Sequence, residues 1–137
     1  MKEIVLHNRI EEIERLATFI DELCDEMGVD PATAFNLNLA LEEAASNIIN
    51  YAFPEGEDHT FTVRALKDET QNKLTLSLCD AGTAFNPLEE APEVDTTLGV
   101  EERAIGGLGI FLIQQIMDGV SYERTDGQNI LTMFKQL

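Results

Sequence analysis

The chain has 137 residues, with 26 Asp and Glu against 9 Lys and Arg, and a formal net charge of -17. This length suits a single domain, residues 1–137, able to bury roughly 70% of the surface that its unfolded chain exposes. The negative charge argues against binding to nucleic-acid phosphates or to anionic membranes. No apolar run approaches the ~20 residues of a membrane span, and the acidic N-terminal residues do not resemble a secretory signal, so we expect a cytoplasmic protein.

The cysteines and histidines give no sign of a disulfide or a metal centre. Cys24 and Cys79 are far apart and stand in apolar stretches typical of a helix and a strand, so we expect buried free thiols. His7 and His59 have no Cys or His neighbours at ligand spacing, which argues against a zinc site.

The first elements are a short strand at residues 3–6 and an amphipathic helix. Asn8 and Glu11 have the spacing of a capping box, and Gly28 is expected to end the helix. Apolar residues recur at helical spacing and are expected to face the core: Ile10, Ile13, Leu16, Ile20, Leu23 and Met27.

A central helix is predicted at residues 31–52. Asp30 and Pro31 supply an N-cap and a first-turn residue, and Pro54 follows its end. One face of this helix is apolar: Leu37, Leu41, Ala44, Ala45 and Ile48.

A polar stripe on the same helix contains Asn36, Glu43, Asn47 and Asn50. It is either a solvated surface or part of a site. Asparagine side chains compete for backbone hydrogen bonds and are a poor choice for a solvated helix face, which favours a site. Glu43 and Asn47 stand at i and i+4 and can direct their oxygens at one target. A carboxylate can take a proton or orient a hydroxyl, and an amide oxygen suits Mg²⁺.

The remaining pattern predicts strands at residues 60–65, 74–79, 120–125 and 128–135, with a hairpin loop at 67–73 and a two-residue turn at Asp126–Gly127. Residues 81–105 form a long acidic loop, which is either a functional lid or a disordered segment. Residues 110–117 predict a helix that is apolar nearly all round. Together these elements predict an α+β fold, with helices on one face of a mainly antiparallel sheet.

Two short motifs could carry chemistry. Asp80 and Gly82 form a D-x-G where a strand ends, which is either an ordinary strand exit or a site where Asp80 accepts a hydrogen bond from an amine such as that of adenine. The GGLG at 106–109 starts the helix at 110–117 and is either a flexible hinge or a phosphate site made of backbone N–H groups. It matches neither the Rossmann nor the P-loop pattern.

Four motifs, taken in this order along the chain, resemble the nucleotide site shared by gyrase, Hsp90, histidine kinases and MutL. They are Glu43-Ala-Ala-Ser-Asn47, Asp80-Ala-Gly82-Thr-Ala-Phe85-Asn-Pro87, Gly106-Gly-Leu-Gly109-Ile-Phe-Leu-Ile and Thr132. Their residue pattern is most similar to that of the bacterial anti-sigma factor serine/threonine kinases. Each motif is weak alone, but four in this order are specific, and the resemblance covers nearly the whole chain.

The resemblance implies a Bergerat-type two-layer α/β sandwich that binds ATP and Mg²⁺ between the central helix, the sheet and the lid. Glu43 would be the general base or water-orienting carboxylate, and Asn47 would be the Mg²⁺ ligand. Asp80 would contact adenine, assisted by Gly82 and Thr132, and Gly107 and Gly109 would hold the phosphates. The other implied ATP contacts are Phe85, Gly106 and Leu108.

Two features depart from the family pattern. Tyr51 stands where many relatives carry His, and Gln114 and Gln115 stand where many carry a basic residue. Arg103 is the only cation close by in the lid, so the phosphate charge must be met mostly by Mg²⁺ and backbone dipoles.

The implied function is an ATP-dependent protein serine/threonine kinase in a partner-switching circuit. Its substrate would be a STAS-type anti-anti-sigma protein and its alternate partner a sigma factor, and homodimerisation is a family expectation. Two alternatives stay open. One is a non-enzymatic, nucleotide-gated interaction module, against which Glu43 argues. The other is a catalytic fragment of a histidine kinase, against which the lack of a preceding helix with a phosphoacceptor His argues.

Overall fold

The computed structural model describes residues 1–86, 88 and 107–137. Its elements in chain order are β1 (Lys2–His7), a 3₁₀ turn η1 (Ile10–Glu12), α1 (Ile13–Met27), α2 (Pro31–Asn47), a π-helix η2 (Ile48–Ala52), β2 (Thr60–Asp68), β3 (Lys73–Asp80), α4 (Gly107–Ile116), β4 (Gly119–Thr125) and β5 (Gln128–Gln136).

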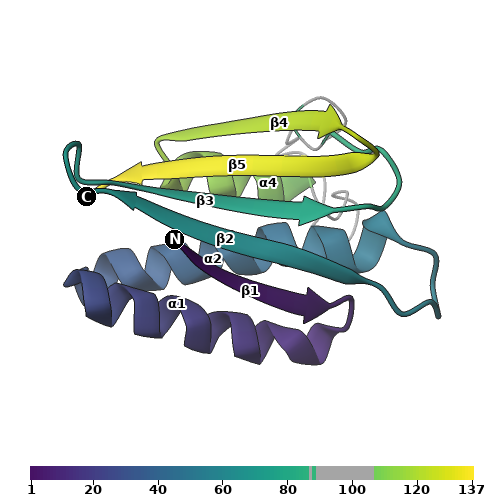
Figure 1. The fold of residues 1–137 in the computed structure, drawn as a ribbon, viewed down its shortest axis with the longest axis horizontal. Helices are drawn as coiled ribbons and strands as arrows, with labels where there is room; N and C mark the ends of the chain where they lie inside the picture. The colour runs from purple at the N-terminus through teal and green to yellow at the C-terminus, as the bar shows by residue number, and fades with distance from the viewer. Residues whose placement is uncertain (87, 89–106) are drawn as a thin grey trace, which may run out of the picture.

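The strands form one five-stranded sheet in the order β1-β2-β3-β5-β4, and every neighbouring pair is antiparallel (Figure 1). The alternation expected from the sequence is confirmed, because one face of each central strand is buried. The buried apolar residues of β2 and β3 are Phe61, Val63, Ala65, Leu74, Leu76 and Leu78.

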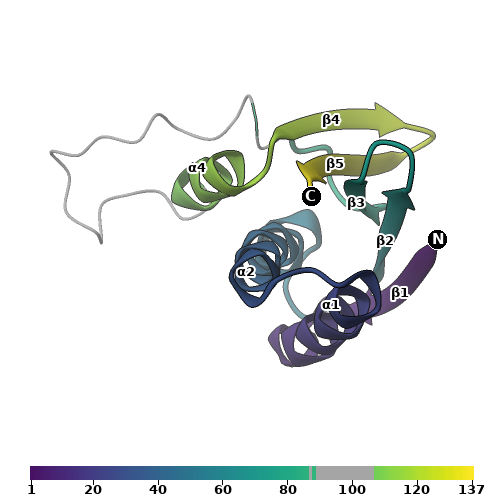
Figure 2. The ribbon, with the colours of Figure 1, turned by 90° about the vertical axis from the view of Figure 1, so that its left-hand side faces the viewer.

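Helices α1, α2 and α4 cover one face of this sheet, with α2 between the other two (Figure 2). The predicted α+β two-layer sandwich is therefore confirmed. Helix α2 begins where the sequence predicts, since the Asp30 side chain accepts a hydrogen bond from the backbone N–H of Thr33 at 3.1 Å and Pro31 occupies the first turn.

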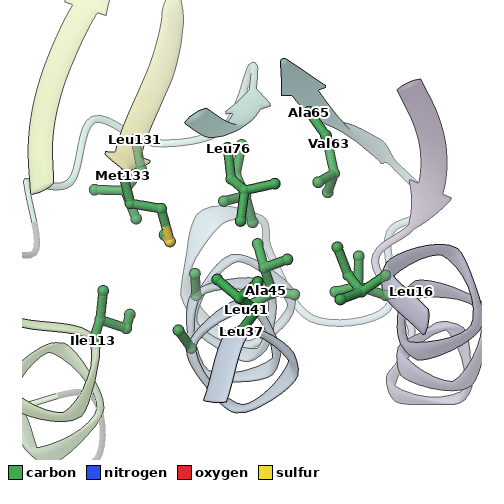
Figure 3. Packing of buried hydrophobic residues seen from close by; sticks show 14 of the residues in the cluster. Leu16, Leu37, Leu41, Ala45, Val63, Ala65, Leu76, Ile113, Leu131 and Met133 are labelled. Atoms are coloured by element: carbon green, nitrogen blue, oxygen red, sulfur yellow. The ribbon is translucent and has the colours of Figure 1, made fainter. Parts of the chain in front are cut away.

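The core lies between the two layers, and Figure 3 shows side chains of α1, α2 and α4 meeting those of β2, β3 and β5. The predicted apolar face of the central helix, which spans α2 and the first residue of η2, is buried throughout: Leu37, Leu41, Ala44, Ala45 and Ile48. Burial of a leucine-sized side chain contributes about 1.5–3 kcal/mol, so this face fixes the helix to the sheet.

The start of the first helix was wrongly predicted. Asn8 does not cap it: the Asn8 side chain donates to Glu57 O at 2.9 Å and accepts from His59 N at 2.8 Å, joining β1 to the chain before β2. A 3₁₀ turn precedes α1, and Ile10 stays 58% exposed instead of entering the core. Gly28 ends α1 as predicted, with φ of 68°, which glycine adopts without strain.

Two further boundaries differ in detail. The β2–β3 hairpin loop is shorter than predicted, because the strands run to Asp68 and restart at Lys73. Helix α4 is buried on one side only, although its sequence is apolar nearly all round: Ile110, Ile113 and Met117, just past its end, are buried, while Phe111 is 46% exposed.

The predicted turn between the last two strands is confirmed. Asp126 and Gly127 both have positive φ, at 51° and 76°, as a type I′ hairpin turn requires. Among the described residues, no helix is both long and apolar enough to cross a bilayer.

Candidate functional site

The residues singled out from the sequence gather at one end of the molecule. Strand β3 ends there at Asp80, β5 begins there, and register pairs Asp80 with Asn129. Helix α4 starts at this end, because its last turn lies at the other end of β5, where Lys135 Nζ donates to Ile116 O at 2.9 Å (Figure 1). The π-helix that follows α2 ends on the same side (Figure 1).

A cavity opens at this end between α2, η2, β3, β4 and β5. Its volume is about 40 Å³. Its lining is mostly apolar with a few polar groups: Ala44, Asn47, Ile48, Ala52, Leu78, Asp80, Phe85, Tyr122, Asn129 and Leu131. Small-molecule sites usually measure roughly 300–1,000 Å³, so this cavity can hold only part of a larger ligand.

Asp80 is the buried carboxyl of the site, with 5% of its surface exposed. Its Oδ1 accepts two hydrogen bonds, from the Gly82 N–H at 2.9 Å and from Asn129 Nδ2 at 3.0 Å. Among the described residues no side chain forms an ion pair with Asp80. A buried carboxyl held by neutral donors in a cavity wall is a strong acceptor for a ligand.

Asn129 is the second buried polar residue of the site, and the sequence analysis missed it. It is 6% exposed, and its Nδ2 also donates to Thr83 O at 2.8 Å. Its Oδ1 accepts from the Tyr122 hydroxyl and from the Phe85 N–H, the latter at 3.4 Å. Strand alternation could have identified it, because Leu131 and Met133 on the same side of β5 are apolar and buried.

Gly82 has a packing role that the sequence did not reveal. A Cβ at this position would lie 2.3 Å from Ala52 O and 2.8 Å from Ala52 Cβ. The next residue, Thr83, donates its N–H to Ala52 O at 2.8 Å. Glycine therefore lets the loop after β3 lie directly on the end of η2, which adds to any role in admitting a base.

Asn47 and Glu43 stand on successive turns of α2. Asn47 lines the cavity, and Glu43 is partly exposed one turn before it and is not part of the lining. Beyond Asn47 the helix changes to the π form of η2. Such π segments are frequently found at functional sites.

Two aromatic rings meet at the rim of the site. Phe85 lines the cavity, and its ring stacks on Tyr51 of η2 with centroids 6.5 Å apart and planes 29° apart. Tyr51 is 41% exposed. The pair joins the loop after β3 to the end of η2.

The glycine motif is described only in part. Helix α4 begins at Gly107, so Gly107, Leu108 and Gly109 form its first turn, as predicted for a helix start. Gly106 lies outside the described residues, as do Arg103 and, of the predicted lid, residues 87 and 89–105. The lid stays a prediction.

Thr132 is not brought to the cavity. It pairs with Ser77 and Ser121 and alternates with the buried Leu131 and Met133, so it points to the opposite face of the sheet. The predicted adenine contact from Thr132 is therefore not supported by the geometry, and Asn129 is the β5 residue that reaches Asp80.

Both cysteines are free, as predicted, although only Cys24 is fully buried. Burial raises the pKa of the Cys24 thiol and that of the Cys79 thiol above the usual value, so both stay protonated near neutral pH. Among the described residues no cluster of His, Cys, Asp and Glu could hold a metal ion on its own.

Comparison with protein families gives a match over almost the whole chain. A family model described as "Histidine kinase-like ATPase domain" matches residues 6–135. Serine/threonine-protein kinase BtrW of Bordetella bronchiseptica is 32% identical over 100 residues, which cover 72% of this chain and 68% of that protein. Serine-protein kinase RsbW of Listeria monocytogenes is 34% identical over 99 residues, covering 70% of this chain and 62% of that protein.

Solved structures with the same fold are more distant in sequence. A chain from the SiaB–SiaC complex of Pseudomonas aeruginosa superposes with a TM-score of 0.59 at 17% identity, covering 96% of this chain and 88% of that one. The histidine kinase domain of a blue-light activated kinase from Erythrobacter litoralis gives 0.52 at 15% identity, covering 93% and 60%. At these identities the two structures establish the fold alone.

Proposed function

Because the chain belongs to the histidine kinase-like ATPase domain family, we propose that it is an ATP-dependent protein serine/threonine kinase that also acts as an anti-sigma-type regulator. One observation carries the proposal: within the matched residues 6–135, the buried carboxyl of Asp80 stands in the wall of a mostly apolar cavity. Such a cavity suits the base of a nucleotide.

The base would enter between Asp80, Phe85 and the end of α2. Asp80 would accept a hydrogen bond from the exocyclic amine of adenine, and the apolar residues Ala44, Ile48 and Leu78 would contact its ring. Since the cavity is only about 40 Å³, the ribose and phosphates of ATP would lie outside it, toward the first turn of α4.

The phosphates would meet backbone N–H groups at the start of α4. The first N–H groups of a helix have no partner within the helix, and the helix dipole favours an anion there. Gly107, Leu108 and Gly109 supply this turn. Asn47 would hold Mg²⁺ through its amide oxygen, and the ion would neutralise charge on the phosphates.

Glu43 is the residue that we assign to the transfer step. It stands one turn from Asn47 on α2 and outside the cavity lining, which suits a group that acts on an acceptor hydroxyl and does not hold the base. Its carboxylate would orient that hydroxyl and take its proton as the serine oxygen bonds to the γ-phosphorus of ATP and the bond to the β–γ bridging oxygen breaks, releasing ADP.

The protein substrate that we propose is a STAS-type anti-anti-sigma protein, with a sigma factor as the alternate partner. The support is the resemblance of the motifs and the likeness to two serine-protein kinases. We further propose that the protein works in the cytoplasm and as a homodimer, as the resemblance implies.

The test is single-turnover transfer of labelled phosphate from Mg·ATP to a purified STAS protein encoded near the gene, with calorimetry on the same samples. Glu43→Gln should slow transfer by ~10² to 10⁴-fold, the usual share of general-base catalysis, and leave ATP affinity nearly unchanged. Glu42→Gln, which changes the neighbouring carboxylate of α2, is the matched control and should transfer at the wild-type rate.

The outcomes separate the candidate functions. Wild-type protein that binds ATP tightly but transfers nothing to any STAS protein would favour the nucleotide-gated interaction module. Wild-type protein that does not respond to millimolar Mg·ATP in calorimetry would contradict nucleotide binding itself.

A further inference from the structure

The hydrogen bonds around Asn129 form a clamp of four polar contacts in the cavity wall. We infer that Asn129, held in place by Tyr122, is a positioning residue that makes the site selective for adenine over guanine by fixing the carboxylate of Asp80. The inference rests on the proposed function, in which Asp80 contacts the base.

The orientation of the Asn129 amide is determined by its four neighbours. Its Oδ1 accepts from the Phe85 N–H, which can only donate, and from the Tyr122 hydroxyl. Its Nδ2 faces two acceptors, Asp80 Oδ1 at 3.0 Å and Thr83 O at 2.8 Å. Turning the amide over would set N–H against N–H and oxygen against carboxylate, so only this orientation satisfies every group.

The clamp leaves one oxygen of Asp80 for a ligand. Oδ1 is occupied by Asn129 and by the Gly82 N–H at 2.9 Å. Within the part of the chain that the structure describes, no donor forms a hydrogen bond to Oδ2. Asn38 Oδ1 is the only fully buried side-chain polar atom without a partner in that part of the chain, so Oδ2 is not sealed off in the core. Oδ2 of Asp80 is therefore the acceptor that a base would meet.

An acceptor held in one orientation distinguishes the two purines. Adenine presents an amine at its six-position and can donate to Oδ2, whereas guanine presents a carbonyl oxygen there, which a carboxylate repels. If the carboxylate could rotate, ATP would lose this directed hydrogen bond, while GTP, which never made it, would lose nothing. Selectivity therefore depends on the residues that stop the rotation.

Tyr122 contributes from the neighbouring strand. It lies on β4, lines the cavity, and donates its hydroxyl proton to Asn129 Oδ1. Among the residues that the structure describes, removing the hydroxyl leaves the weaker Phe85 contact, at 3.4 Å, as the one remaining donor to that oxygen. The Asn129 amide then turns more freely, and its hydrogen bond to Asp80 Oδ1 weakens.

Two variants test the clamp at different strengths. Tyr122→Phe keeps the ring and removes one hydrogen bond, so ATP should bind about 3- to 10-fold more weakly, with little change for GTP. Asn129→Asp keeps the size but replaces the two N–H donors by an oxygen that repels Asp80, so the ratio of ATP to GTP affinity should fall by about 10-fold or more. Ser121→Ala, beside Tyr122 but on the opposite face of β4, is the control.

The measurements are calorimetric titrations with Mg·ATP and Mg·GTP, thermal unfolding, and the transfer rate at saturating ATP. We expect the two variants to change the ratio of ATP to GTP affinity far more than the saturated transfer rate, because neither residue is placed at the phosphates. If Asn129→Asp does not fold, Tyr122→Phe decides the matter.

The failures are distinguishable. Wild-type protein that binds neither nucleotide would overturn the proposed function and this inference together. Wild-type protein that prefers ATP, with folded variants that keep the same preference or lose both nucleotides equally, would overturn the clamp and leave the proposed function standing.

Discussion

Replacing Gly82 by Ala tests whether the loop after β3 must lie directly on the end of η2. The added Cβ would stand 2.3 Å from Ala52 O, well inside the 3.0 Å that Cβ contacts essentially never breach. The obstacle is backbone and cannot swing away. Gly82 is not among the glycines with positive φ, so the effect of the substitution is steric and not conformational.

The magnitude follows from three contributions. Overpacking of this kind costs about 1–3 kcal/mol. Separating the two segments also weakens the Thr83 N–H to Ala52 O hydrogen bond of 2.8 Å, a net loss of about 0.5–1.5 kcal/mol. Alanine restricts the unfolded chain, which offsets about 0.4–1 kcal/mol. The free energy of unfolding should therefore fall by about 2 kcal/mol.

The site should suffer as well, because Gly82 donates its N–H to Asp80 Oδ1 at 2.9 Å. Urea unfolding and calorimetric ATP titration measure the two effects. Gly119→Ala is the control: its Cβ would approach the Phe134 ring at 2.1 Å, but that side chain is 37% exposed and can turn aside, so ATP affinity should not change. Gly82→Ala protein with wild-type stability and ATP affinity would refute the reasoning.

Two other substitutions test the helix that carries the site. Asn47→Ala should reduce both Mg·ATP affinity and transfer rate, unlike Glu43→Gln, because it removes the proposed metal ligand; calorimetry with and without Mg²⁺ checks this, and an equal loss without Mg²⁺ would speak against metal binding. Asp30→Ala should destabilise the protein at pH 7 but much less at pH 3. The hydrogen bonds from the Thr33 hydroxyl and N–H hold the pKa of Asp30 in the folded protein below its usual value. The stabilisation that the Asp30 carboxylate gives to the folded state is therefore complete above the usual pKa and is lost as the pH falls through the folded pKa. Urea unfolding of both proteins at the two pH values measures the difference, and a pH-independent gap would contradict it.

Local signals in the sequence predicted most of the fold. The N-cap at Asp30, the stop at Gly28 and the turn at Asp126–Gly127 depend on neighbouring residues, and all three are confirmed. The strands follow from period-two alternation over a core on one side. Asn8 was misassigned because its actual partners, Glu57 and His59, are some fifty residues away and its local spacing mimics a cap.

The site was predicted less completely, for a similar reason. Asp80, Asn47 and Phe85 were identified from motifs, and the structure brings all three to one cavity. The motifs pointed to Thr132 as the site residue of β5 and not to Asn129. Alternation along β5 already places these two side chains on opposite faces of the sheet. What alternation cannot give is the register that sets Asn129 opposite Asp80, since that depends on how two strands pair across 49 residues of sequence.

The end of η2 and the loop after β3 satisfy each other's backbone groups, and this explains why the cavity forms where it does. A helix ends with carbonyl groups that lack partners within the helix. Here the Ala52 carbonyl accepts the Thr83 N–H, Thr83 O in turn accepts from Asn129, and Arg124 of β4 donates to Gly82 O at 2.8 Å. The loop that follows Asp80 is thus fixed from η2, β4 and β5 before any ligand arrives. A carboxyl positioned in this way loses little conformational freedom on binding, so more of each contact with the base is available as affinity.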